Sequence, residues 1–184
     1  MAHHTALLVM DMQKGILSAC PQRAQLVDRV CEAIAIARKK ALDIIFVRLA
    51  FRHGMPEISE SNLIFAALKQ RLANVDLREF VQLHPQLDVQ PGDTIVEKKR
   101  VSAFTGSDLE VMLRTLNVSH LVLSGYATSG VVLSTLREAA DKDYRISVLS
   151  DGCADADPVV HETLVERIFP RQASVLSIAD WAVL

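Results

Sequence analysis

Long apolar runs are missing from this sequence of 184 residues, although 50% of its residues are hydrophobic. A helix needs about 18 or more consecutive apolar residues to cross a bilayer, and no segment reaches that length. We therefore predict no membrane partner. The N-terminal residues also lack the charged lead, apolar segment and cleavage site of a secretory signal, which favours a cytoplasmic protein.

Cysteine is scarce, with three residues at positions 20, 31 and 153. Their odd number argues against a disulfide framework, and their spacing matches no common set of metal ligands. The formal net charge of -2 argues against a nucleic-acid partner. No Gly-x-Gly-x-x-Gly motif indicates a dinucleotide. We expect a protein of a reducing compartment that uses no metal ion and no cofactor.

Breaks between domains are missing too, because no repeat, low-complexity tract or Gly/Ser-rich linker interrupts the chain. The length is typical of one domain, so we predict a single domain over residues 1–184. Short β-branched segments alternate with longer amphipathic ones. Strands are predicted at residues 5–10, 44–50, 94–98, 120–124, 145–149 and 174–177, and helices at about 22–40, 61–72, 108–116, 131–142 and 158–169.

The strands at 5–10 and 120–124 contain unbroken apolar runs, which indicate burial on both faces. Strand–helix alternation with right-handed crossovers then produces a parallel sheet between two helical layers. The sequence predicts an α/β protein of the three-layer α/β/α type.

Polar residues gather where the predicted strands end. Asp11 follows the first strand, Lys98 ends the third, and a Gly/Thr-rich turn at residues 125–130 follows the fourth. In open parallel sheets, sites form outside the carboxyl ends of the strands. An acid, an amine and a flexible turn are therefore expected at one edge.

Burial raises the pKa of a carboxyl group and a nearby ammonium lowers it, so an Asp–Lys pair suits proton transfer. The structural alternative makes Asp11 the N-cap of the following turn. Lys98 and Lys99 compete for the inward position, because strand alternation sends them to opposite faces. Arg100 is expected to face solvent or another subunit.

The turn at residues 125–130 joins a strand to a helix, where backbone N–H groups without partners are able to hold an anion or an oxyanion. The alternative is an ordinary turn capped by Thr128 or Ser129. The spacing alone does not choose between these two interpretations.

Three sequence blocks resemble the isochorismatase-like hydrolases, a superfamily that includes nicotinamidases and N-carbamoylsarcosine amidases. They are LLVMDMQ at residues 7–13, IVEKKRVSAFTGSDL at residues 95–109, and GYATSGVV at residues 125–132, with Thr135 following. The similarity runs from about residue 5 to 175. It implies a Rossmann-like, six-stranded, mostly parallel sheet in a homo-oligomer, a dimer or a tetramer, with a small-molecule substrate.

The resemblance assigns the acid–base pair to Asp11 and Lys98, and it thereby selects Lys98 over Lys99. It implies a cis peptide at Tyr126–Ala127. The residues that it places around the substrate are Gln13, Phe104, Tyr126, Ala127, Thr128, Gly130 and Val131.

One position departs from the amidase members, which have cysteine where this chain has Val131. Valine cannot attack a carbonyl, so thiol chemistry is not expected there. Members that cleave isochorismate instead have a small residue at this position. Cys153 lies near the edge but is expected to be a buried structural thiol, and His120 and His161 are expected to be structural.

The family's metal-binding nicotinamidases use Asp and His residues after the second strand. Here that region offers only His53 beside Arg52, and one histidine is a weak ligand set, so we predict no zinc. Arg48 and Arg52 are candidates for holding a substrate carboxylate through paired hydrogen bonds, with a surface or interface role as the alternative.

These observations favour a thiol-independent hydrolase of the isochorismatase type, acting on a small, carboxylate-bearing metabolite. Asp11 is its proton donor, Lys98 positions Asp11, and Gln13 orients substrate or water. One alternative is a non-catalytic small-molecule binder or scaffold that has lost the nucleophile. Another is an amide or carbamoyl hydrolase with a relocated nucleophile such as Cys153.

Overall fold

One six-stranded sheet organises the computed structural model, which describes residues 4–184. Its strand order is β3-β2-β1-β4-β5-β6, and every neighbouring pair is parallel. The α/β class and the six-stranded parallel sheet predicted from the sequence are confirmed. The strands are β1 (His4–Met10), β2 (Asp43–Leu49), β3 (Thr94–Lys98), β4 (Val118–Tyr126), β5 (Arg145–Ala154) and β6 (Ser174–Leu176).

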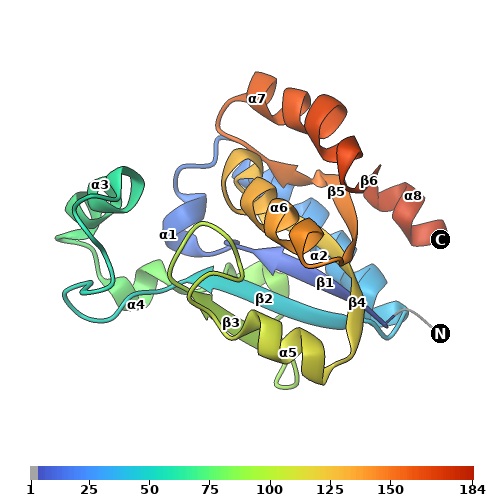
Figure 1. Cartoon of the computed structure of the whole chain (residues 1–184), viewed down its shortest axis with the longest axis horizontal. Coiled ribbons are helices and arrows are strands. Elements are labelled where there is room, and N and C mark those ends of the chain that lie inside the picture. Colours follow the sequence, from blue (N-terminus) through green and yellow to red (C-terminus); the bar gives the residue numbers. More distant parts are fainter. Residues whose placement is uncertain (1–3) are drawn as a thin grey trace.

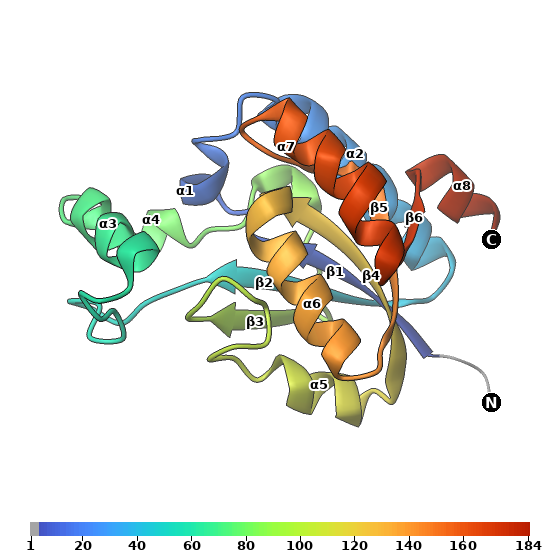
Figure 2. The same ribbon diagram turned by 45° about the horizontal axis from the view of Figure 1, so that its top comes forward.

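Helices cover both faces of this sheet (Figures 1 and 2). One layer holds α2 (Arg23–Lys39) and α8 (Ile178–Val183), and the opposite layer holds α5 (Leu109–Thr115), α6 (Leu133–Asp141) and α7 (Pro158–Thr163). A π-helical turn, η2 (Thr128–Val132), leads into α6, and α7 continues through η3 (Leu164–Ile168) and η4 (Phe169–Arg171). The helix predicted from residue 131 therefore starts at residue 128.

The position of β1 in the sheet explains why its sequence is almost entirely apolar. Leu8 and Met10 belong to the core beneath α5 and α6, whereas Leu7 and Val9 belong to the core beneath α2. All four side chains have no exposed surface. Because successive strand residues point to opposite faces, a strand that is covered on both sides needs apolar residues at every position.

The strand order reverses between β1 and β4, because the chain proceeds outward from β1 to β3 and from β4 to β6. Open α/β sheets bind ligands at such a switch point. Met10 pairs with Gly125 there, and a Cβ atom at Gly125 would collide with the Met10 carbonyl. Glycine therefore permits the close approach of the two strands on which the site is built.

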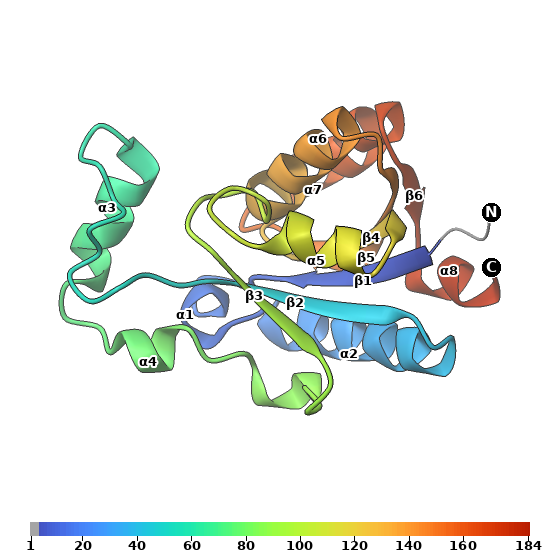
Figure 3. The ribbon, with the colours of Figure 1, turned by 60° about the horizontal axis from the view of Figure 1, so that its bottom comes forward.

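Residues 51–82 leave the sheet after β2 and return before β3, and we call this segment the arm. It carries α3 (Leu63–Leu72) and α4 (Leu77–Phe80), and α3 stands apart from both helical layers (Figures 1 and 3). A small cluster holds the arm together, formed by Leu49, Met55, Ile58, Phe65, Leu72 and Phe80. The predicted helix at 61–72 is present, but the sequence did not predict that it projects.

Short helices were missed by the sequence prediction: α1 (Lys14–Leu17), α4, η1 (Pro85–Leu87) and α8. No helix within residues 4–184 is long and apolar enough to cross a membrane. The prediction about the N-terminal segment rests partly on residues 1–3, which lie outside the described residues.

Candidate active site

Asp11 lies immediately after β1 with its carboxyl group buried. Its backbone N–H donates to the Val47 carbonyl at 2.8 Å, while its φ of 56° turns the chain sharply, a conformation that Asp adopts more readily than most residues. The residue is 6% exposed. Its side chain does not cap α1, whose N-cap is Gln13 without a side-chain bond, so the structural alternative for Asp11 is wrong.

The Asp11 carboxylate meets one cation. Its Oδ2 lies 2.9 Å from the Lys98 Nζ, whereas Oδ1 is buried and has no hydrogen-bond partner among the described residues. Burial raises the pKa of Asp11, and the charge and hydrogen bond of Lys98 lower it by less. A buried oxygen without a partner favours the protonated acid, because burying an unbonded charge is costly.

Lys98 ends β3 and is 2% exposed. Besides Asp11, its ammonium donates to the carbonyls of Arg100 at 2.9 Å and Val101 at 3.0 Å. These three acceptors match the three N–H bonds of an ammonium. Lys99 turns elsewhere and donates to the Ala50 carbonyl at 2.8 Å. The geometry thus pairs Lys98, and not Lys99, with Asp11.

Three backbone donors in and after the turn that follows β4 have acceptors. The Ser129 N–H donates to Asp155 Oδ2 at 2.7 Å, and the N–H groups of Gly130 and Val132 both donate to the Ala127 carbonyl. An open cradle of these amides for an anion is therefore absent. Neither Thr128 nor Ser129 caps the helix either, because the N-cap is Ala127. The Tyr126–Ala127 peptide is cis.

Thr128 has a partner that sequence reasoning missed. Its Oγ1 lies 2.8 Å from Nδ1 of His161 on α7, and burial lowers the pKa of this histidine. The only signal in the sequence for this contact was that α7 follows β5. Its first residues therefore lie near the carboxyl edge of the sheet, where the turn after β4 also lies. Because Thr128 is fully buried, this pair fixes α7 against η2.

Gln13 is fully buried, but its carboxamide contacts backbone. It donates to the carbonyls of Leu49 at 3.0 Å and Phe80 at 3.1 Å and accepts the Leu49 N–H at 2.7 Å. These contacts hold the end of β2 and the arm to the start of α1. The predicted role in orienting substrate or water is therefore replaced by a structural one.

Val131 and Phe104 share one apolar cluster with the core beneath α6. Val131 is 2% exposed. The Phe104 ring lies 6.1 Å from that of Tyr144, with the Lys142 ammonium over its face. Both side chains are therefore part of the hydrophobic core next to the sheet edge that carries Asp11.

Cys153 lies on β5 opposite Gly125. Its Sγ is 3.9 Å from the Leu123 carbonyl, and burial raises the pKa of its thiol to about 12. At neutral pH a thiol with this pKa is protonated, and its burial agrees with the structural role expected for it. His120 contacts the hydroxyl groups of Thr5 and Ser147, as expected of a structural histidine.

Arg48, near the end of β2, and Arg52, which follows the strand, are engaged in ion pairs. Arg48 lies 2.6 Å from Glu97, and Arg52 lies 2.8 Å from Glu57, which supports the surface interpretation over a free carboxylate clamp. His53 is exposed. Within residues 4–184, no group of three or more His, Cys, Asp or Glu side chains is placed to hold a metal ion.

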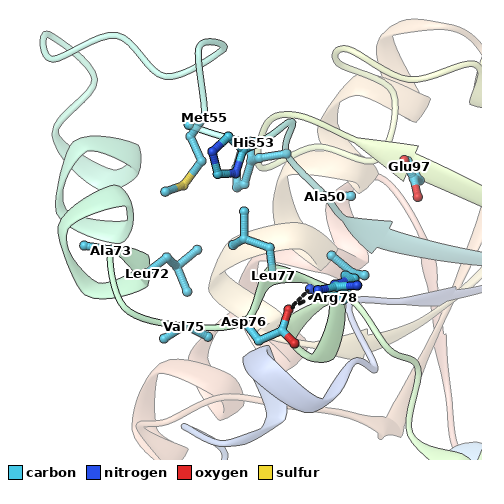
Figure 4. A pocket seen from close by; sticks show the side chains of 13 residues that line it. Ala50, His53, Met55, Leu72, Ala73, Val75, Asp76, Leu77, Arg78 and Glu97 are labelled. Carbon is cyan, nitrogen blue, oxygen red and sulfur yellow. Dashed lines mark hydrogen bonds and ion pairs between the residues drawn. The ribbon is translucent and has the colours of Figure 1, made fainter.

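Two cavities flank the arm. One, of about 620 Å³, lies between the arm and the end of β2, where His53, Met55 and Leu72 point into it (Figure 4). The other, of about 550 Å³, opens between α1, α3 and α4 and reaches Tyr126, the residue that ends β4. Its size suits a small molecule. Its apolar walls are Ile16, Leu68, Leu72, Val75 and Phe80, and its charged residues are Lys14, Arg71 and Glu79.

The fold and the site together define a Rossmann-like α/β protein with a buried acid–amine pair at the switch point of its sheet. A family model described as the isochorismatase domain matches residues 5–180, and the chain belongs to the isochorismatase family.

Relatives agree with this assignment along most of the chain. The isochorismatase family protein YwoC of Bacillus subtilis (strain 168) is 34% identical over 167 residues, which cover 91% of this chain and 86% of YwoC. Ureidoacrylate amidohydrolase RutB of Stutzerimonas stutzeri (strain A1501) is 30% identical over 179 residues, which cover 85% and 72%. The structure of an isochorismatase family protein from Burkholderia thailandensis superposes with a TM-score of 0.87 at 29% identity, covering 100% of this chain and 96% of that one.

Proposed function

We propose that this chain is a hydrolase that uses Asp11 and Lys98 without a thiol nucleophile and acts on a small, carboxylate-bearing metabolite. The observation that carries the proposal is the buried Asp11 carboxyl group, which has Lys98 on one oxygen and, among residues 4–184, no hydrogen-bond partner on the other. The oxygen without a partner is where a proton is held and from which it is transferred.

The substrate class that fits this acid is a vinyl ether of an α-keto acid. Asp11 donates its proton to the terminal vinyl carbon, which becomes a methyl group, and positive charge develops on the carbon bonded to the ether oxygen. Water adds to that carbon and returns a proton to the Asp11 carboxylate. The resulting hemiketal collapses to an alcohol and a keto acid, so one water is consumed and the acid is regenerated.

Lys98 serves this cycle by stabilising the carboxylate that remains after Asp11 gives up its proton. Because its ammonium is already held by Asp11 and two carbonyls, it needs no reorganisation when the charge appears. Val131 stands where the amidase members of the family have cysteine, and its isopropyl group forms wall there. The loss of a thiol is tolerated in this scheme because no covalent intermediate is required.

The cavity beside Tyr126 is the proposed substrate chamber. It adjoins the end of β4, and the backbone after Asp11 leads directly into Lys14 on its wall. Its apolar surface takes the body of the substrate, while Lys14 and Arg71 favour a carboxylate. Tyr126 donates to the Ala19 carbonyl at 3.0 Å, which fixes this part of the chamber wall.

Amide hydrolysis, the activity in the name of the relative RutB, is the second candidate. A thiol mechanism would have to use Cys153, and its thiol pKa of about 12 leaves almost no thiolate at neutral pH. The third possibility is ligand binding without turnover.

A test of the proposal measures keto-acid release, from isochorismate and from a panel of vinyl ethers, amides and carbamoyl compounds. We expect turnover of a vinyl ether and a loss of about 10³-fold in kcat for Asp11→Asn. Asp108→Asn is the matched control, because Asp108 is exposed and, although it is the N-cap residue of α5, its side chain makes no capping hydrogen bond. Full activity in Asp11→Asn would sink the proposal, and thermal stabilisation by a vinyl ether without product would favour the binder.

We also propose that the chain is one domain, acts as a dimer or tetramer, and works in the cytoplasm. Leu63 and Ile64, at the start of α3, are 83% and 66% exposed, and a second copy would cover such apolar surface. The three cysteines are free, as is usual in a reducing compartment.

A further inference from the structure

The position of Lys98 depends on the chain that follows it. Two of its three acceptors are the carbonyls of Arg100 and Val101, so the backbone of residues 99–101 folds back over the ammonium. Any displacement of these carbonyls would move the lysine relative to Asp11. Residues 99–101 are therefore the part of the molecule that sets the geometry of the acid–amine pair.

Arg100 holds this backbone in place, whereas the sequence led us to expect that it faces solvent or another subunit. Its Nη2 donates to the Glu57 carbonyl in the arm at 2.9 Å, and its Nη1 donates to the Lys99 carbonyl at 2.7 Å. The guanidinium also lies over the Phe65 ring of α3, with 5.6 Å from Cζ to the ring centroid. One residue thus binds the lysine through its carbonyl and the arm through its side chain.

We propose that Arg100 is a positioning residue, which clamps residues 99–101 onto the arm and thereby holds Lys98 against Asp11. It reaches the reacting atoms only through Lys98. Its catalytic consequence rests on the proposed function, whereas its effect on the acid–amine pair does not. The arm, which forms one wall of the proposed substrate chamber, is coupled to the acid in this way.

Loss of the Arg100 contacts is expected to change the pKa of Asp11. Lys98 is the charged group that lowers the pKa of Asp11 against burial. If loss of the Arg100 contacts lets the Lys98 ammonium move away from Asp11, the ammonium no longer offsets the effect of burial, and the pKa of Asp11 rises. The proton is then held more tightly and transferred less readily, so kcat falls.

The experiment compares Arg100→Ala and Arg100→Lys with Arg114→Ala, a control that removes an exposed arginine paired with Glu110 on α5. Carbon-13 NMR of the Asp11 carboxyl group, titrated without substrate, is the first measurement. We expect the titration to move to higher pH in Arg100→Ala, to move less in Arg100→Lys, and to stay unchanged in the control. Should Arg100→Ala not fold, Arg100→Lys against wild type still decides.

The second measurement is the pH profile of kcat with the best vinyl ether found. We expect Arg100→Ala to lower kcat by about tenfold and to shift the alkaline limb to higher pH. An Asp11 titration identical to wild type in folded Arg100 variants would overturn the clamp. If wild type turns over no vinyl ether, the proposed function fails, but the carboxyl titration still tests the clamp.

Discussion

The sheet and the arm are built on different principles. The sheet is covered on both faces by two large apolar clusters, whereas the arm depends on six buried residues and has a cavity on each side. Asp11 and Lys98 lie at strand ends, whereas the walls of the chamber come from the arm and from α1 and the residues that follow it. Under the proposed function, the sheet would therefore supply the acid–amine pair, and the arm would contribute to the recognition of substrate.

The largest effect is expected when the Lys98 amine is removed, which tests whether the sheet supplies the chemistry. We expect Lys98→Met to reduce kcat by about 100-fold and to move the alkaline limb of the profile to higher pH. The reason is that the pKa of Asp11 rises further once the Lys98 charge is gone. The pH dependence of kcat measures this effect.

Lys39→Met is the matched control, because Lys39 is an exposed lysine in the last turn of α2. Its profile should superpose on that of wild type. Near-normal activity of Lys98→Met would show that the core pair is structural and that the chemistry lies elsewhere.

A smaller effect should distinguish the arm from the core. Leu72→Ala opens the arm cluster and enlarges the wall shared by both cavities, and it should raise KM by about tenfold while kcat stays close to wild type. Both steady-state constants and thermal unfolding are needed, because the truncation also costs about 2–5 kcal/mol of stability.

Leu113→Ala supplies the same truncation in the sheet region, since Leu113 on α5 is fully buried in the core. It should reduce stability without changing KM. If the two variants alter KM equally, the assignment of recognition to the arm is wrong.

The sheet was predictable because its pattern is local. Continuous apolar runs mark strands that are covered on both faces, and Asp11 stands directly after such a run. Lys98 instead ends the edge strand β3, in which Ile95 and Glu97 are exposed. Helices of four residues, such as α1 and α4, were missed because they are too short to show a helical period.

The finer contacts of the site were not predictable for another reason. The bonds from Gln13 to Phe80, from Arg100 to Glu57 and from His161 to Thr128 join residues that are 67, 43 and 33 positions apart. No local pattern encodes which backbone group or hydroxyl a polar side chain reaches after folding. These contacts also corrected the expected roles of Gln13 and Arg100.

The titration of the wild-type Asp11 carboxyl group tests the central claim most directly. Carbon-13 NMR should show it ionising well above the range near 4 of an ordinary Asp, because burial outweighs the opposition of Lys98. Since the folded-state pKa is raised, the protonated acid stabilises the fold at low pH, and this contribution is lost as the pH rises through that pKa. A carboxyl group that titrates at or below the ordinary value would contradict the account, because Asp11 would then have no proton to donate.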